Sequence, residues 1–85
     1  MSSISICAVI PTLNEEEHVA QCIAELKNQS VSQIIVADGG SDDRTLEIAR
    51  ELGVEVVSSQ RGRGHQLQAA VNHTNCDFIW MIHAD

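Results

Sequence analysis

The sequence predicts an α/β fold, in which a mostly parallel Rossmann-like sheet is covered by helices on both faces to make three layers. Three observations predict it. Short apolar runs alternate with stretches of helical periodicity, in the order β-α-β-α-β-α-β. Runs such as IIVA lack the alternation of a half-exposed strand, which suits strands covered on both faces. Polar or glycine-rich residues follow every predicted strand, where open parallel sheets bind ligands.

The first strand and the first helix follow from an apolar run and then a helical period. Residues 5–10 are mostly apolar and Pro11 follows them, so a strand is expected there. Residues 14–29 have a helical period, with an apolar face made of Val19, Cys22, Ile23 and Leu26. Asn14, with Glu17 three residues later, resembles a capping box and predicts that the helix begins at Asn14.

The next three elements repeat this pattern. Residues 33–37 are expected to form the second strand. Residues 43–52 are expected to form a helix that Gly53 ends, and residues 54–58 a third strand.

The last helix and strand complete the predicted unit. After QRGRG, a helical register predicts one buried face made of Leu67, Ala70, Val71 and Thr74. A fourth strand is expected to open at Cys76 or Asp77, and its apolar part, residues 78–82, is expected to be buried. Strands that alternate with helices imply right-handed crossovers between parallel strands.

Charge and hydropathy exclude several classes of partner. The 85 residues carry a formal net charge of −7, which a nucleic-acid backbone would repel, so no nucleic-acid binding is expected. The apolar runs are too short to span a bilayer. At this length, residues 1–85 make at most one small domain.

The three cysteines, Cys7, Cys22 and Cys76, are predicted to be reduced. Their number is odd, they form no CxxC pair, and each lies in an apolar stretch where a thiol packs like a small hydrophobic side chain. The sequence also opens without the basic and long apolar regions of a signal peptide. These observations predict a cytoplasmic protein.

The acidic residues after the second strand have different predicted roles. Asp38 follows the strand directly and precedes two glycines, which let a ligand approach the backbone closely. Asp38 is therefore predicted to bind a ligand, with a simple turn as the alternative. Asp42 and Asp43 stand where Asp commonly caps a helix, and a capping role is favoured for them.

The stretch after the third strand contains Arg61 and Arg63, which could meet a small anion at a helix N-terminus. Its glycines do not make a dinucleotide fingerprint, because Leu67 occupies the third glycine position. A solvated turn explains the stretch equally well.

His83 and Asp85 end the fourth strand. Alternate residues of an extended strand point the same way, so both could face one divalent cation. One carboxylate is too few ligands for Mg²⁺ or Mn²⁺, which commonly adds water and substrate phosphates. A diphosphate is therefore expected to share the site.

The stretches VIPTLNEEE, VADGGSDDRT, RGRG and HAD, in this order, resemble the N-terminal half of family 2 glycosyltransferases. The resemblance covers essentially all 85 residues, and the HAD ending, together with ADGGSxD and RGRGxQ, resembles a bacterial sub-branch of that family. It implies the GT-A fold and the transfer of a sugar from a nucleotide-diphosphate sugar, with a UDP-sugar as the leading donor. It also implies inversion at the donor carbon.

The resemblance implies a role for each motif residue. Pro11 and Thr12 would line the base, Glu15 would approach the ribose, and Asp38 would hydrogen-bond the base. Arg63 would lie beside the diphosphate.

The metal motif departs from the family pattern. Asp85 matches the last acid of the DxD motif, which binds Mg²⁺ or Mn²⁺, but His83 stands in place of the first acid. The family pattern continues past this motif with the acceptor site and general base, so no catalytic residue is assigned in residues 1–85. We expect a truncated donor-binding subdomain that is inactive alone and self-associates through an uncovered sheet edge.

Two other functions stay open. One is a non-catalytic nucleotide-binding module built on the same kind of sheet. The other is a nucleotidyltransferase, which also places phosphates and Mg²⁺ at strand ends. Its glycine-rich basic loop should follow the first strand, where PTLNEE stands instead. A dehydrogenase is disfavoured on the same ground, because GxGxxG should occupy that place.

Overall fold

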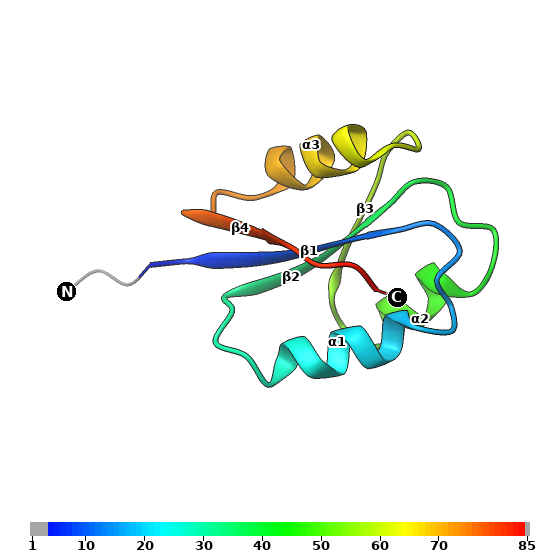
Figure 1. The fold of residues 1–85 in the computed structure, drawn as a ribbon, viewed down its shortest axis with the longest axis horizontal. Helices are drawn as coiled ribbons and strands as arrows, with labels where there is room; N and C mark the ends of the chain where they lie inside the picture. Colours follow the sequence, from blue (N-terminus) through cyan, green and yellow to red (C-terminus); the bar gives the residue numbers. More distant parts are fainter. Residues whose placement is uncertain (1–3, 85) are drawn as a thin grey trace.

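The computed structural model describes residues 4–84 and contains a four-stranded parallel sheet (Figure 1). Its strands lie in the order β3-β2-β1-β4 and every neighbouring pair is parallel. Their bounds are β1 Ile6–Thr12, β2 Gln33–Asp38, β3 Glu55–Ser58 and β4 Phe78–Met81. The predicted α/β fold with a parallel sheet is therefore confirmed.

Helices cover both faces of the sheet and make the predicted three layers. The helices are α1 Val19–Lys27, α2 Thr45–Glu51 and α3 Arg63–His73. Figure 1 shows α1 and α2 below the sheet and α3 above it. Successive residues of β1 point to opposite faces, so Ala8 and Ile10 pack toward α1 and α2, whereas Cys7 and Val9 pack toward α3.

The two central strands are buried on both faces, as the continuous apolar runs predicted, but β4 is not. Phe78 is 59% exposed and Trp80 is 46% exposed. The expectation that residues 78–82 form a buried strand is therefore wrong. The physical reason is the position of β4 at the edge of the sheet, where β1 is the strand that pairs with it.

The first helix begins later than the capping pattern predicted. Asn14 has a left-handed backbone (φ 57°), and α1 starts only at Val19. The Asn14 side-chain oxygen accepts a hydrogen bond from the backbone N–H of Asp42, at 2.9 Å, so it does not cap α1. The predicted capping box of Asn14 and Glu17 is therefore wrong, because the Asn14 side chain bonds to Asp42 in the loop after β2 and not to the first turn of α1.

The buried face of α3 also differs from the prediction. Gln66 and Ala70 are its buried residues, whereas Val71 is 42% exposed and Thr74 lies just after the helix. In contrast, Gly53 ends the α2 region as expected, with a φ of 76° that favours glycine. No helix within residues 4–84 is long and apolar enough to cross a membrane.

The prediction that all three cysteines are reduced is wrong for two of them. Cys7 and Cys76 form a disulfide, with their Cα atoms 5.8 Å apart, and Cys22 stays a buried thiol. The two partners are separated by 69 positions in the sequence. They meet because β1 and β4 are neighbours in the sheet.

The matched pair Ile10 and Ile4 tests the position of the core. Ile10 is fully buried and Ile4 is 66% exposed. We expect Ile10→Ala to lower the free energy of unfolding by about 2–5 kcal/mol, because it leaves a cavity between the sheet and α1. Ile4→Ala should change it by less than about 0.5 kcal/mol. Urea denaturation measures both, and equal effects would contradict this core.

Candidate functional site

The carboxyl ends of β1 and β2 are joined by a buried hydrogen bond. Thr12 and Asp38 are paired in register as the last residues of their strands. The Thr12 hydroxyl donates to Asp38 Oδ1 at 2.7 Å, and each residue is only 1% exposed. Two residues predicted to contact a nucleotide are therefore brought together, and they contact each other.

Asp38 also holds the loop that follows it. Its Oδ2 accepts the backbone N–H groups of Gly40, at 3.0 Å, and of Ser41, at 2.7 Å. Its Oδ1 accepts the Ser41 hydroxyl in addition to that of Thr12. An ionised carboxylate has about four acceptor positions, and these four hydrogen bonds use them. The structure thus gives Asp38 an anchoring role in the turn, which was the alternative to ligand binding for this residue.

The pKa of Asp38 reflects two opposing effects. Burial raises the pKa of a carboxyl, but the hydrogen bonds from Ser41, Thr12 and Gly40 outweigh burial and lower the pKa of Asp38 below its ordinary value. The charged form is therefore the one that the folded chain favours. That Asp38 accepts a hydrogen bond from a base stays a prediction.

The loop after β1 interlocks with the loop after β2. The backbone N–H of Asn14 donates to the Ser41 hydroxyl at 2.8 Å. The backbone N–H of Glu15 donates to the Thr45 hydroxyl, also at 2.8 Å. Asp43 accepts the N–H of Glu16 and that of Thr45, the first residue of α2. The N-cap residue of α2 is Arg44, so the predicted capping by Asp42 or Asp43 is met only in part, by the hydrogen bond from Thr45 to Asp43. These contacts fix the backbone of the segment that carries Glu15.

Gln66 holds the ends of three elements together, and the sequence alone predicts no role for it. Its side-chain amide donates to the carbonyl oxygens of Thr12, at 2.9 Å, and Ala37, at 2.8 Å. Its side-chain oxygen accepts the N–H of Gly62 at 3.3 Å. Gln66 is 6% exposed. Two signals were available, the Gln of RGRGxQ and a polar residue one turn before Ala70, on what proves to be the buried face of α3.

Gly39 allows this close approach. A Cβ atom at Gly39 would lie 3.1 Å from the side-chain carbonyl carbon of Gln66 and 3.2 Å from the Cα atom of Arg61. Cβ atoms in proteins rarely approach other heavy atoms this closely. A side chain at Gly39 would therefore press against Gln66 of α3 and against the backbone at Arg61, and these neighbours would have to shift by a few tenths of an ångström.

Arg63 and His83 meet beside these strand ends. Arg63 is the first residue of α3, and its guanidinium lies 3.2 Å from Nε2 of His83, which follows β4. Both side chains are exposed. Because a guanidinium only donates, the imidazole nitrogen is the acceptor of this hydrogen bond. A residue predicted to bind diphosphate and a residue predicted to bind metal therefore face each other.

The described residues do not by themselves make a site for Mg²⁺ or Mn²⁺. Within residues 4–84, no group of three or more His, Cys, Asp or Glu side chains could hold a metal ion. The nitrogen that His83 would offer is directed at the positively charged Arg63. These cations prefer several oxygen ligands. Asp85, the other predicted ligand, lies outside the described residues.

A shallow groove borders His83 on its other side. It has a volume of about 410 Å³ and lies between α1 and residues 80–84. Cys22, Trp80 and Ile82 are among its lining residues. The groove does not include Thr12 or Asp38, so the hydrogen-bonded strand ends and this groove are separate features.

A parallel α/β sheet with polar loops gathered at its carboxyl ends is the arrangement at which open α/β proteins bind their ligands. Residues 7–85 match the model of glycosyl transferase family 2. The chain therefore belongs to glycosyl transferase family 2.

Individual relatives agree with this membership. Glycosyltransferase AglJ of Haloferax volcanii is 34% identical over 83 residues, which are 95% of this chain and 27% of that protein. The 4,4'-diaponeurosporenoate glycosyltransferase of Staphylococcus haemolyticus is 32% identical over 90 residues, covering 95% of this chain and 24% of that protein. This chain thus spans about a quarter of the length of these curated relatives.

A solved structure matches over nearly the whole chain. It is glucosyl-3-phosphoglycerate synthase from Mycobacterium tuberculosis, in complex with Mn²⁺, UDP-glucose and phosphoglyceric acid. It superposes with a TM-score of 0.85 at 30% identity, over 98% of this chain and 34% of that chain. The GT-A fold expected from the sequence is therefore confirmed.

The role of the Asp38 carboxylate has a direct test. Asp38→Asn replaces one accepting oxygen by an NH₂ group, which faces either the backbone N–H donors of the loop or two hydroxyl donors. Because one donor then faces another, we expect the substitution to lower the free energy of unfolding by about 2 kcal/mol. Asp42→Asn is the control, because Asp42 is exposed and takes part through its backbone N–H. Equal stability of the two variants in urea denaturation would contradict the anchoring role.

The same pair of variants has a predicted pH dependence. Because folding lowers the pKa of Asp38, its contribution to stability is present above the unfolded pKa, about 3.9, and is lost as the pH falls through the lower folded value. The stability difference between wild type and Asp38→Asn should therefore shrink as the pH falls below about 4. Denaturation curves across this range measure the difference, and a difference that grows toward acid would contradict the account.

Gln66 is tested against Gln68 in the same helix. Gln66→Leu leaves two strand-end carbonyls without their amide partner, so we expect a loss of about 1–3 kcal/mol. Gln68 is exposed and bonds only to Asn72 among the described residues, and Gln68→Leu should cost less than about 0.5 kcal/mol. A Gln66→Leu protein as stable as the control would remove Gln66 from this role.

Proposed function

We propose that this chain is the donor-binding part of a glycosyltransferase that moves a sugar from a nucleotide-diphosphate sugar to an acceptor. The leading donor is a UDP-sugar. One observation carries the proposal. The ends of β1 and β2, the start of α3 and the end of β4 all meet at one end of the sheet, and the chain is a member of glycosyl transferase family 2. UDP-glucose in the solved relative supports the choice of donor.

The base and ribose are proposed to bind along the segment from Pro11 to Glu15. Thr12 is buried and hydrogen-bonded inward, so its proposed contribution to the base is the shape of the backbone. Glu15 is half-buried, and its backbone is fixed by Thr45. The Glu15 carboxylate, which is part-exposed in this fixed loop, is proposed to accept a hydrogen bond from a ribose hydroxyl.

The diphosphate is proposed to bind at Arg63. Arg63 is exposed and begins α3, where unpaired backbone N–H groups and the helix dipole favour an anion. The guanidinium adds charge-assisted hydrogen bonds to phosphate oxygens. His83 accepts from the same guanidinium and so orients it.

A divalent cation is proposed to accompany the diphosphate, with Asp85 and His83 as its protein ligands. Mn²⁺ in the solved relative supports this proposal. When bound, such a cation neutralises negative charge on a departing nucleotide diphosphate. Because the described donors alone do not fit a cation, the proposal depends on Asp85.

The remaining steps are proposed to need more than these 85 residues. The relatives are about three to four times longer, and the acceptor site and general base are proposed to lie in their additional length. The 85 residues alone are accordingly proposed to bind nucleotide without turning over a sugar donor. Transfer with inversion and a cytoplasmic location are parts of the same proposal.

A second copy of this chain is proposed to bind at the β4 edge. This edge is unpaired within residues 4–84, and it presents the exposed side chains of Phe78 and Trp80. Sedimentation velocity of wild type and Trp80→Lys tests it. We expect a concentration-dependent dimer that the substitution abolishes, and a monomer at all concentrations would contradict it.

Nucleotide binding is tested with UDP and an Arg63→Ala variant. We expect calorimetric titration to show UDP binding that Mn²⁺ strengthens, and a loss of about 10-fold or more in affinity on Arg63→Ala, because a charge-assisted contact is removed. Arg50→Ala is the matched control, since Arg50 lies in the last turn of α2.

The outcomes separate two failures. If neither the wild type nor Arg50→Ala binds UDP, GDP or ADP, with or without Mn²⁺, the proposed donor-binding function is wrong. If Arg63→Ala binds UDP as tightly as Arg50→Ala, the diphosphate lies elsewhere.

A further inference from the structure

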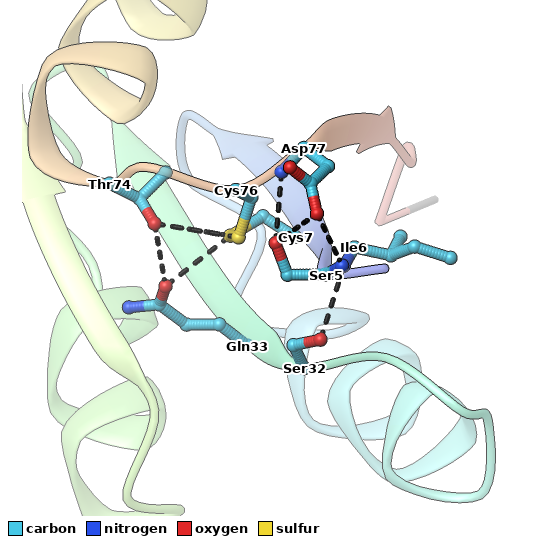
Figure 2. The surroundings of a disulfide bond; sticks show 8 residues. All are labelled: Ser5, Ile6, Cys7, Ser32, Gln33, Thr74, Cys76 and Asp77. Atoms are coloured by element: carbon cyan, nitrogen blue, oxygen red, sulfur yellow. Dashed lines mark hydrogen bonds between the residues drawn. A yellow bond between two sulfur atoms is a disulfide. The ribbon is translucent and has the colours of Figure 1, made fainter. Parts of the chain in front are cut away.

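The start of β4 is fastened to β1 by two sets of contacts on the side away from the proposed nucleotide site. In the first, the Asp77 carboxylate accepts the N–H of Ser5 at 2.9 Å and the Ser5 hydroxyl at 3.1 Å. In the second, the disulfide joins Cys7 of β1 to Cys76, two residues before β4 (Figure 2). β4 is a four-residue strand at the edge of the sheet and, within residues 4–84, pairs with β1 alone, so these contacts add to a short ladder of backbone hydrogen bonds.

The surroundings of the disulfide suit both oxidation states. Figure 2 shows Thr74 and Gln33 beside the two sulfur atoms. The Thr74 hydroxyl donates to Gln33 Oε1 at 2.8 Å, so neither group depends on the sulfur atoms for a partner. Gln33 Oε1 lies 3.3 Å from Cys7 Sγ, where it can accept from a thiol after reduction. The Thr74 oxygen lies 3.5 Å from Cys76 Sγ and offers the second thiol a partner.

The two sulfur atoms differ in access. Cys7 is fully buried, whereas Cys76 is half-buried. An external thiol therefore reaches Cys76 first. Cys22 is unlike both, because burial, and then the negative charge of Glu25, raise the pKa of its thiol. A thiol with a raised pKa forms less of the reactive thiolate, which makes Cys22 an internal control.

We propose that Cys7 and Cys76 are a reversible redox pair that fastens or releases the start of β4, and so sets how firmly the strand holds His83 beside Arg63. Transient, redox-sensing disulfides are the kind that cytoplasmic proteins contain. The inference therefore rests on the proposed function for two points, the cytoplasmic location and the role of the residues that β4 carries.

The exchange is balanced with glutathione as the partner. A glutathione thiolate attacks Cys76 Sγ, the Cys7–Cys76 bond breaks, and Cys7 leaves as a thiolate that takes a proton. A second glutathione thiolate attacks the glutathione sulfur of the mixed disulfide, which releases the Cys76 thiolate and oxidised glutathione. Overall, the protein disulfide gains two electrons and two protons, and two glutathione molecules are oxidised to one disulfide.

Thiol trapping tests the redox step without any nucleotide. The protein is equilibrated in buffers of varied reduced-to-oxidised glutathione ratio, alkylated after unfolding, and weighed by mass spectrometry. We expect one alkylated cysteine, Cys22, in oxidising buffer and three in reducing buffer. Three at every ratio, or one even in the most reducing buffer, would overturn the proposal. Failure of the donor-binding proposal leaves this readout unchanged.

Hydrogen exchange tests the consequence for β4. On reduction we expect the amide of Ile82, which donates to the Val9 carbonyl, to exchange about 10-fold faster or more, while amides of β2 change little. Reduction should also lower the melting temperature by roughly 10 °C. Cys76→Ser should behave like the reduced wild type in either buffer, and Cys22→Ala should keep the redox response. Equal exchange at Ile82 in both states would overturn the role of the pair in holding β4.

Discussion

The buried hydrogen bond between Thr12 and Asp38 is the contact on which the arrangement of the strand ends depends. It closes the β1–β2 pair at its last residues, and the same carboxylate then turns the chain through Gly40 and Ser41. A buried carboxylate without these donors would be costly, so the loop and the carboxylate require each other. The loop after β2 is therefore fixed relative to the sheet before any ligand is bound.

The other functional segments are positioned relative to this pair of strand ends. Ser41 holds Asn14, which places the segment carrying Glu15, and Gln66 holds the start of α3 against the carbonyls of Thr12 and Ala37. Arg63 then lies where it meets His83 from β4. The proposed nucleotide site thus consists of exposed groups supported by a buried hydrogen-bond network, with few of the network's own polar atoms left for a ligand.

Local periodicity and turn residues were enough to predict the strands, the helices and the end of the sheet that carries polar loops. They were not enough wherever strand order or a tertiary partner decides the outcome. Asn14 and Glu17 match a capping pattern, but the Asn14 side chain accepts a hydrogen bond from the backbone of Asp42 instead. Trp80 looks buried until β4 is known to lie at the edge. The pairing of Cys7 with Cys76 cannot be predicted from their distant positions in the sequence, because it depends on β1 and β4 being neighbours in the sheet.

The central claim is that the buried network is already formed and that a nucleotide binds to the exposed groups above it. An amide-resolved NMR titration with UDP tests this most directly. We predict that the amides of Asn14, Glu15 and residues 61–64 shift, while the Ser41 amide is protected from exchange before UDP is added. Rapid exchange at Ser41 in the free protein, or shifts confined to the opposite strand ends near Ser32 and Gly53, would contradict the account.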